Sequence, residues 1–210
     1  MHPERRRCTG PERFLSIAMA TFDDYDGVYF TAQSIRLYHP EITAQSEILV
    51  LDNHPDGPAA AALKQLDSCV AGYRYVPYGG HRGTAVRDLL FREANAQWVL
   101  CVDSHVQFAP GSLARLVEFL GERGDSLDLW QGPLLNDNLY SVSSHLEPVW
   151  SAGMYGQWRE DPRAASALTS PRGAAIGSRW ERWRPSCFRD TLFNPPFWAK
   201  PACVQNGFKG

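Results

Sequence analysis

Residues 97–123, QWVLCVDSHVQFAPGSLARLVEFLGER, join a strand-like run to a helix-like run. The first part is continuously apolar up to residue 102, which is typical of a strand buried on both faces. In the second part Ser112 is the expected N-cap, and apolar residues recur at helical spacing at Leu113, Leu116, Val117 and Leu120. A polar tripeptide, residues 103–105, closes the strand-like run 97–105. The stretch therefore predicts a strand that ends in ligand-capable side chains, followed by a helix.

The same alternation extends along most of the chain. Strand-like runs occupy residues 14–22, 46–53, 72–78 and 128–137, and helix-like runs occupy 28–39, 58–69 and 84–96. Alternating strands and helices predict an α/β fold with a mainly parallel sheet and flanking helices, because right-handed crossovers bring successive strands side by side. In such sheets ligands bind beyond the carboxyl ends of the strands. The polar loops 21–27, 52–57, 79–87 and 103–105 are all predicted to lie at that edge.

The chain divides into three parts on these patterns. Residues 1–13 are expected to form an N-terminal extension, and residues 14–140 the α/β domain. Residues 141–210 are expected to be an acceptor-side or irregular segment, because strand and helix periodicity stops from Asp161 onward. A chain of 210 residues with 44% hydrophobic residues is large enough for one domain with such an appendage.

Composition narrows the classes of function. A formal charge of -2 lacks the basic excess of a nucleic-acid-binding protein, so no nucleic-acid partner is expected. The five cysteines include no CxxC pair, which favours reduced thiols and a cytoplasmic location. Residues 14–22 are interpreted as the first strand rather than as part of a signal peptide. No run approaches the roughly 20 apolar residues of a transmembrane helix, so no transmembrane segment is expected.

The tripeptide at residues 103–105 suggests a metal site. Successive side chains of a strand point to opposite faces, so Asp103 and His105 are expected to share one face and Ser104 to take the other. A carboxylate and an imidazole suit Mn²⁺, or Mg²⁺ less well, and His145 is a candidate third ligand. The alternative is that Asp103 caps a loop and the two histidines are surface residues.

Four motifs in this order carry a resemblance to a known family. They are SIAMATFDDYDG at 16–27, EILVLDNHPDG at 47–57, HRGTAVRDLL at 81–90 and WVLCVDSHVQFAPGSLARL at 98–116. Together they resemble the ordered motif series of family 2 glycosyltransferases with the GT-A fold, in which Asp103-Ser104-His105 stands where the family usually has D-x-D. The resemblance implies a sugar nucleotide, in the first instance a UDP-sugar, as donor and a divalent metal ion as cofactor.

The resemblance also implies roles for single residues. Thr21 and Phe22 would contact the nucleoside, Asp52 would accept a hydrogen bond from the uracil ring, and Asp103 would contact both the ribose and the metal ion. The residues alone leave an alternative for two of these roles. Asp52 is then a turn residue, and Phe22 is an ordinary core residue. Arg82 and Arg87 flank a predicted helix start, where guanidinium groups would bind a pyrophosphate. A solvated helix end is the alternative for Arg82.

The catalytic carboxylate is less well defined. Asp137, at the end of the fifth strand-like run, is the best-placed candidate for a base near the acceptor. The favoured hypothesis is a metal-dependent glycosyltransferase acting on an unknown acceptor, which is a glycan, lipid, protein or small molecule. One alternative is a catalytically incomplete nucleotide-binding module of the same fold. Another is a nucleotidyltransferase, although the acidic first loop lacks the Gly-rich, Lys-bearing pattern expected of that class.

Overall fold

A computed structural model of the chain describes residues 13–80, 86–122 and 124 in full, and the backbone of short strands between residues 129 and 199. The main sheet has seven strands in the order β10-β5-β11-β4-β1-β2-β3. Its parallel part consists of β1 (Arg13–Thr21), β2 (Ser46–Asp52), β3 (Tyr73–Pro77) and β4 (Ala96–Asp103). The prediction of an α/β fold with a mainly parallel sheet is thereby confirmed.

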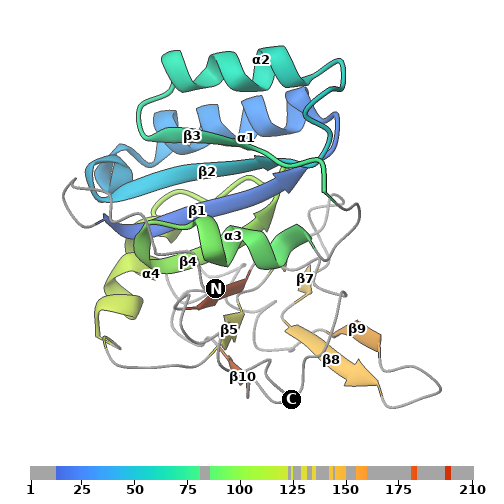
Figure 1. Cartoon of the computed structure of the whole chain (residues 1–210). Coiled ribbons are helices and arrows are strands. Elements are labelled where there is room, and N and C mark those ends of the chain that lie inside the picture. The colour runs from blue at the N-terminus through green and yellow to red at the C-terminus, as the bar shows by residue number, and fades with distance from the viewer. Residues whose placement is uncertain are drawn as a thin grey trace, which may run out of the picture.

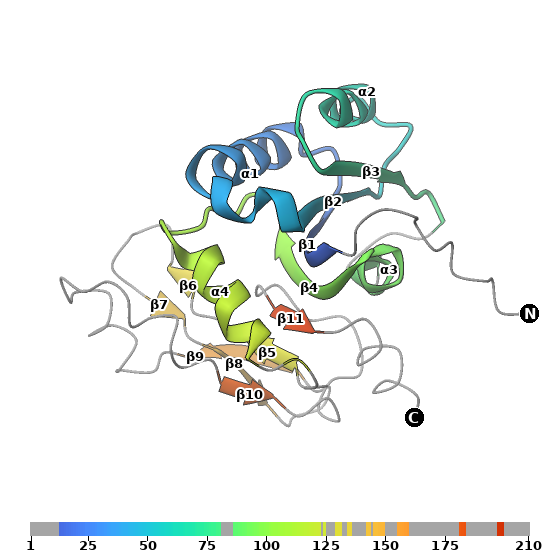
Figure 2. The same cartoon turned by 90° about the vertical axis from the view of Figure 1, so that its left-hand side faces the viewer.

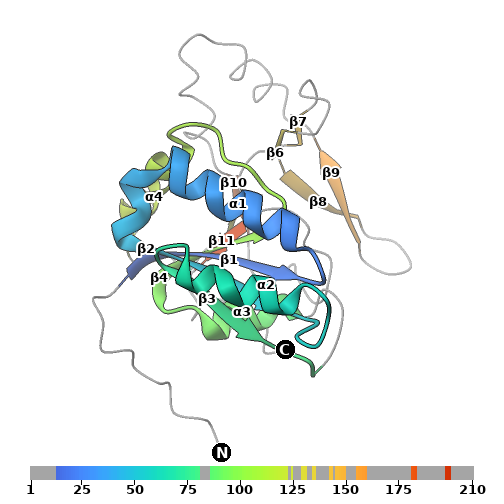
Figure 3. The same cartoon turned by 90° about the horizontal axis from the view of Figure 1, so that it is seen from above.

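Helices cover both faces of this parallel part (Figures 1 and 2). The α-helices are α1 (Tyr25–Tyr38), α2 (Ala60–Gln65), α3 (Arg87–Glu93) and α4 (Ser112–Gly121), and two 3-10 helices are η1 (Pro40–Gln45) and η2 (Leu66–Ser68). Figure 2 shows α1 and α4 on one side of β1 and β4, and α3 on the other. Seen from above, α1 and α2 run along the sheet side by side (Figure 3). The N-cap of α4 is Gly111 rather than the predicted Ser112, because Gly111 takes a left-handed conformation with φ of 73°.

Strand alternation sorts the core into two clusters. Ile17, Ile48, Trp98 and Leu100 face α1, α2 and α4, whereas Ala18, Leu49, Val99 and Cys101 face α3. All eight side chains are buried. Burial on both faces explains why these strands read as continuous apolar runs rather than as alternating ones.

The strand register aligns the ends of the parallel strands. Thr21 lies opposite Asp52, Ala20 opposite Asp103, and Asp52 opposite Pro77. The polar loops that follow β1, β2 and β4 therefore start from one edge of the sheet, as the sequence predicts.

The fifth strand-like run, residues 128–137, does not form one strand. Its backbone contains β5 (Leu129–Gln131) and β6 (Leu134–Leu135), which belong to different sheets. The sequence between them is Gly-Pro, and proline has no N–H to donate to a strand ladder. β5 also joins the sheet through antiparallel pairing, whereas β1 to β4 pair with one another in parallel.

The segment after residue 140 contains short strands that the sequence pattern does not predict. β10 (Glu181–Trp183) pairs with β5, and β11 (Phe197–Ala199) lies between β5 and β4. Two hairpin-like pairs lie apart from the main sheet: β6 with β7 (Val142–Ser143), and β8 (His145–Val149) with β9 (Tyr155–Arg159). At three to five residues each, β8 to β11 are too short to show a clear periodicity in sequence.

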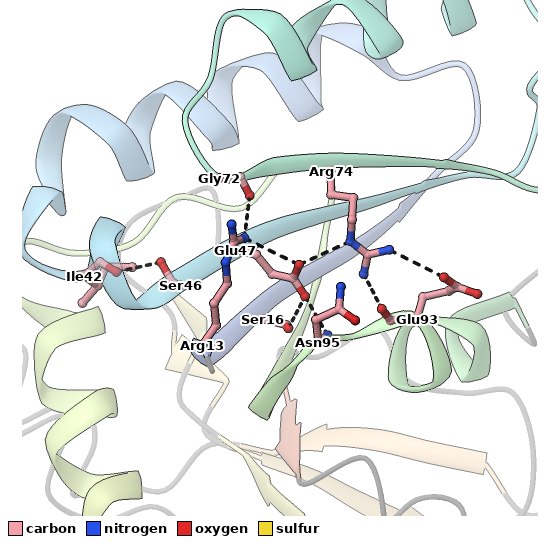
Figure 4. Close-up of polar contacts among 9 residues, drawn as sticks. All are labelled: Arg13, Ser16, Ile42, Ser46, Glu47, Gly72, Arg74, Glu93 and Asn95. Carbon is pink, nitrogen blue, oxygen red and sulfur yellow. Dashed lines mark hydrogen bonds and ion pairs between the residues drawn. The ribbon is translucent and has the colours of Figure 1, made fainter. Parts of the chain in front are cut away.

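The opposite, amino-terminal edge of the sheet contains a buried carboxylate network (Figure 4). The Glu47 side chain is 2% exposed and accepts hydrogen bonds from Ser16 Oγ at 2.5 Å and from the Asn95 backbone N–H at 2.9 Å. Arg74 Nε donates to its other oxygen at 3.3 Å, and Arg13 Nη1 lies 3.7 Å from the same oxygen. Burial opposes ionisation of Glu47, but the bonds from Ser16, Asn95 and Arg74 outweigh it and lower its pKa. This network joins the starts of β1, β2 and β3 to the turn before β4.

Candidate functional site

The candidate site is the carboxyl edge of the parallel strands, where Asp103 ends β4 and Arg87 begins α3. Arg87 Nη2 donates a hydrogen bond to Asp103 Oδ1, and both side chains are mostly buried. Asp103 lies on the face of β4 that packs against α3, as Val99 and Cys101 do. The structure therefore brings together two predicted site residues that are 16 positions apart in sequence.

The Arg87–Asp103 pair combines opposite charges at a mostly buried position. In such a place the attraction is less screened than on the surface, and a planar guanidinium group has a geometry that matches carboxylate and phosphate oxygens. The pair thus places a guanidinium group and a carboxylate side by side at the carboxyl edge of the sheet. A guanidinium group at this edge is suited to bind a phosphate-bearing ligand.

Ser104 and His105 contact a different partner. Ser104 Oγ donates to Asp24 Oδ2, and His105 Nδ1 lies 3.5 Å from the same oxygen. The prediction that Asp103 and His105 share one face is wrong: His105 lies with Ser104 beside Asp24, whereas Asp103 contacts Arg87. β4 ends at Asp103 and the chain turns at residues 104–105, so strand alternation does not continue to His105.

Asp24 holds the first turn of α1 as well as the turn after β4. Its Oδ1 accepts from Gly27 N at 2.9 Å and so caps the helix. Partial burial opposes its ionisation, but bonds from Ser104, Gly27 and His105 prevail and lower the pKa of Asp24. Thr31 Oγ1 strengthens the same junction by donating to the backbone oxygens of Ser104 at 2.8 Å and Val106 at 3.0 Å.

Asp52 is placed at the predicted edge but is almost fully buried, with 1% exposure. Its Oδ1 accepts from the His54 backbone N–H at 2.9 Å, and its Oδ2 accepts from Tyr75 Oη at 2.7 Å. Burial and this bond to Asp52 raise the pKa of Tyr75. The turn role for Asp52 is therefore observed, and its contact with a base stays a prediction.

The loop after β1 contains Phe22, which is 48% exposed and so is not an ordinary core residue. Its ring stacks on the His54 imidazole with centroids 4.7 Å apart and planes 8° from parallel. His54 Nδ1 also lies 2.5 Å from Asp23 Oδ2. Thr21, next to Phe22, is buried, and its hydroxyl lies 3.4 Å from the Asp24 backbone oxygen.

A metal ion would have two protein ligands here at most among the described residues. No group of three His, Cys, Asp or Glu side chains comes together in that part of the chain. Asp103 and His105 still supply the oxygen and nitrogen donors that Mn²⁺ accepts, and the His105 side chain is 71% exposed. The donor chemistry fits a metal whose other positions are filled by ligand oxygens.

Three predicted residues are not placed. Arg82 and Asp137 lie outside the described residues, and of His145 only the backbone, as the first residue of β8, is described. Sequence reasoning missed Asp23, Asp24 and Tyr75. The N-cap position of Asp24, immediately before a helix with Asp26 in its first turn, was a usable signal. The contact between Asp23 and His54 gave no signal in the sequence, because the two residues are 31 positions apart.

The sequence model of glycosyl transferase family 2 matches residues 16–180, which is most of the chain and includes every one of the four motifs. The chain belongs to this family. Its parallel four-stranded sheet with flanking helices is a GT-A-like fold, in agreement with the resemblance noted in the sequence. Among curated proteins, no relative matches the chain.

Several solved structures are similar to part of it. S. aureus TarS 1-349 has 15% identity and a TM-score of 0.46, over 52% of this chain and 32% of that one. The same protein in complex with UDP-GlcNAc has 16% identity and a TM-score of 0.44, over 52% and 31%. Mannosyltransferase PcManGT from Pyrobaculum calidifontis, in complex with GDP-Man and Mn²⁺, has 14% identity and a TM-score of 0.48, over 57% and 35%. The chain thus spans about a third of the length of each of these proteins.

In the described residues, no helix is long and apolar enough to cross a membrane.

Proposed function

We propose that the chain is a metal-dependent glycosyltransferase that binds a nucleotide sugar, in the first instance a UDP-sugar, at the carboxyl edge of its sheet. The observation that carries this proposal is the Arg87–Asp103 pair at the end of β4, within the part of the chain that matches the family. It supplies a cation for a diphosphate and a carboxylate beside it. The acceptor is a glycan, lipid, protein or small molecule.

The chemistry follows from where charge develops. When the bond from the sugar to the diphosphate breaks, the departing nucleoside diphosphate gains negative charge. Arg87, held in place by Asp103, would donate hydrogen bonds to that diphosphate as the charge grows. The Asp24 bonds to Ser104 and His105 would keep the turn after β4 in a fixed position beside it.

A divalent cation held by Asp103 and His105 would neutralise part of the same charge when bound. Mn²⁺ suits the mixed oxygen and nitrogen donors better than Mg²⁺ does. His145 is proposed as a third ligand and Arg82 as a second phosphate contact. Asp137 is proposed as the base that takes the proton of the acceptor hydroxyl.

The test is thermal unfolding with UDP, GDP and other nucleoside diphosphates, each with and without Mn²⁺. A ligand at a hundred times its dissociation constant should stabilise the folded chain by about 2.7 kcal/mol. The Asp103→Asn variant should lose the Mn²⁺-dependent part of this gain. Asp88→Asn is the matched control, because Asp88 is a surface carboxylate of α3 paired only with Arg92 among its described contacts.

The results separate the alternatives. No stabilisation by any nucleoside diphosphate would contradict the proposal. Binding without slow hydrolysis of any sugar nucleotide would instead favour a catalytically incomplete nucleotide-binding module of the same fold. Pyrophosphate release from a nucleoside triphosphate would indicate a nucleotidyltransferase.

A further inference from the structure

The loops that follow β1 and β2 are fastened to each other by four residues, Phe22, Asp23, His54 and Gly57, which we call the loop latch. His54 contacts two consecutive residues of the β1 loop: its ring stacks on Phe22, and its Nδ1 lies 2.5 Å from Asp23 Oδ2. The side chains of His54 and Asp23 are 28% and 27% exposed, so the contact is partly shielded from water.

The geometry leaves little freedom to either loop. Asp23 has φ of 53°, a left-handed conformation that costs energy for a residue with a side chain. Its Oδ1 is buried and has no hydrogen-bond partner among the described residues, so the bond from His54 is the one that holds this carboxylate. A carboxylate oxygen accepts hydrogen bonds and does not donate them, so we assign the hydrogen of the His54 ring to Nδ1.

Gly57 packs closely against both Asp23 and His54. A Cβ atom at this position would lie 2.2 Å from Asp23 Oδ1 and 2.5 Å from His54 Nδ1, which is far inside contact distance. Gly57 N also donates to the His54 backbone oxygen at 2.8 Å, and the His54 backbone N–H donates to Asp52. His54 is therefore fixed at its backbone by the turn and at its ring by Asp23 and Phe22.

We infer that His54 is a positioning residue, which holds the half-exposed ring of Phe22 flat and in one orientation as a platform for a planar base. The inference rests on the proposed function, since the base is that of the bound nucleotide. A ring that is already fixed loses no rotamer freedom on binding, so its stacking energy appears in full as affinity. Asp52 supports this arrangement, because it accepts hydrogen bonds from the His54 backbone N–H and from the Tyr75 hydroxyl and so fixes the turn that contains His54.

The experiment compares UDP with inorganic pyrophosphate, both with Mn²⁺, by calorimetry. His54→Gln keeps an N–H donor for Asp23 but removes the ring, whereas His54→Phe keeps a ring but removes the donor. Gly57→Ala forces Asp23 and His54 apart. Each should weaken UDP at least about fivefold, the lower bound for losing an aromatic–base stack, and leave pyrophosphate within about twofold. Gly121→Ala in α4 is the control, because nothing lies within 4 Å of its added methyl group.

Three further readouts test this inference. If wild-type protein binds pyrophosphate but not UDP, the platform is wrong while the phosphate site stands; if it binds neither, both proposals fall. Equal losses for UDP and pyrophosphate in folded variants would also overturn it. If the variants do not fold, nitrogen NMR of the wild-type protein decides: a hydrogen on His54 Nδ1 supports the latch, and a hydrogen on Nε2 alone refutes it.

Discussion

Replacing Glu47 by glutamine should destabilise the fold by an amount that the network in Figure 4 allows us to work out. The amide oxygen of glutamine can keep the bonds from Ser16 and Asn95, which both go to Oε1. Its NH₂ group then faces Arg74 and Arg13, two donors that lose their acceptor. The loss of a hydrogen bond to a charged group costs about 1.5–3 kcal/mol. Glu47→Ala removes every bond and should cost about 3–5 kcal/mol.

The dependence on pH provides the sharper check. The pKa of Glu47 in the folded chain lies below its ordinary 4.5, so its stabilising effect is complete above pH 4.5. It is lost as the pH falls through the lowered folded-state pKa. The difference in unfolding free energy between wild type and Glu47→Gln should therefore be constant near pH 7 and shrink below pH 4.5.

Urea unfolding at several pH values measures both effects. Glu93→Gln is the control, since Glu93 contacts the same Arg74 at 3.5 Å but is 47% exposed, and such surface pairs contribute about 1 kcal/mol or less. If Glu47→Gln costs no more than Glu93→Gln, or if its cost does not vary with pH, the reasoning about this buried carboxylate is wrong.

Three other predictions concern the rest of the described chain. Cys101 is fully buried, and burial raises its pKa to about 12. In the native protein iodoacetamide should therefore label exposed Cys69 but not Cys101, which mass spectrometry of the two peptides would show. Equal labelling of the two cysteines would contradict this. Thr31→Val removes two bonds to the turn after β4 and should cost about 1–3 kcal/mol in urea unfolding, whereas Thr31→Ser should restore most of it. Tyr75→Phe leaves Asp52 Oδ2 without its bond and should cost about 1–2 kcal/mol, a value that an unchanged denaturation midpoint would refute.

The parallel half of the fold could be predicted because its signals are local. The buried strands are long apolar runs, and the helices between them show a regular spacing of apolar residues, so element type and order follow from the sequence. The antiparallel half of the sheet could not be predicted in this way. β11 is positioned by its pairing with Val99–Cys101, which lie about a hundred positions earlier in the chain. Three residues carry too little pattern to reveal such a partner.

The same limit applies to the candidate site. The alignment of Thr21, Asp52 and Asp103 at one edge follows from parallel strands, and the sequence predicts it. Which side chains contact one another depends on where each strand stops. Because β4 stops at Asp103, His105 turns toward Asp24, and only Asp103 faces Arg87. Two residues of strand length, from Asp103 to His105, separate the predicted geometry from the observed one.

The position of β11 has a consequence for synthesis on the ribosome. Until residues 197–199 leave the exit tunnel, β4 lacks the neighbour that later pairs with it, and its backbone N–H and C=O groups on that side have no partner from β11. An open strand margin of this kind recruits other chains. Nascent copies stalled before residue 197 should therefore aggregate or require a chaperone, although the β1–β4 core is already complete.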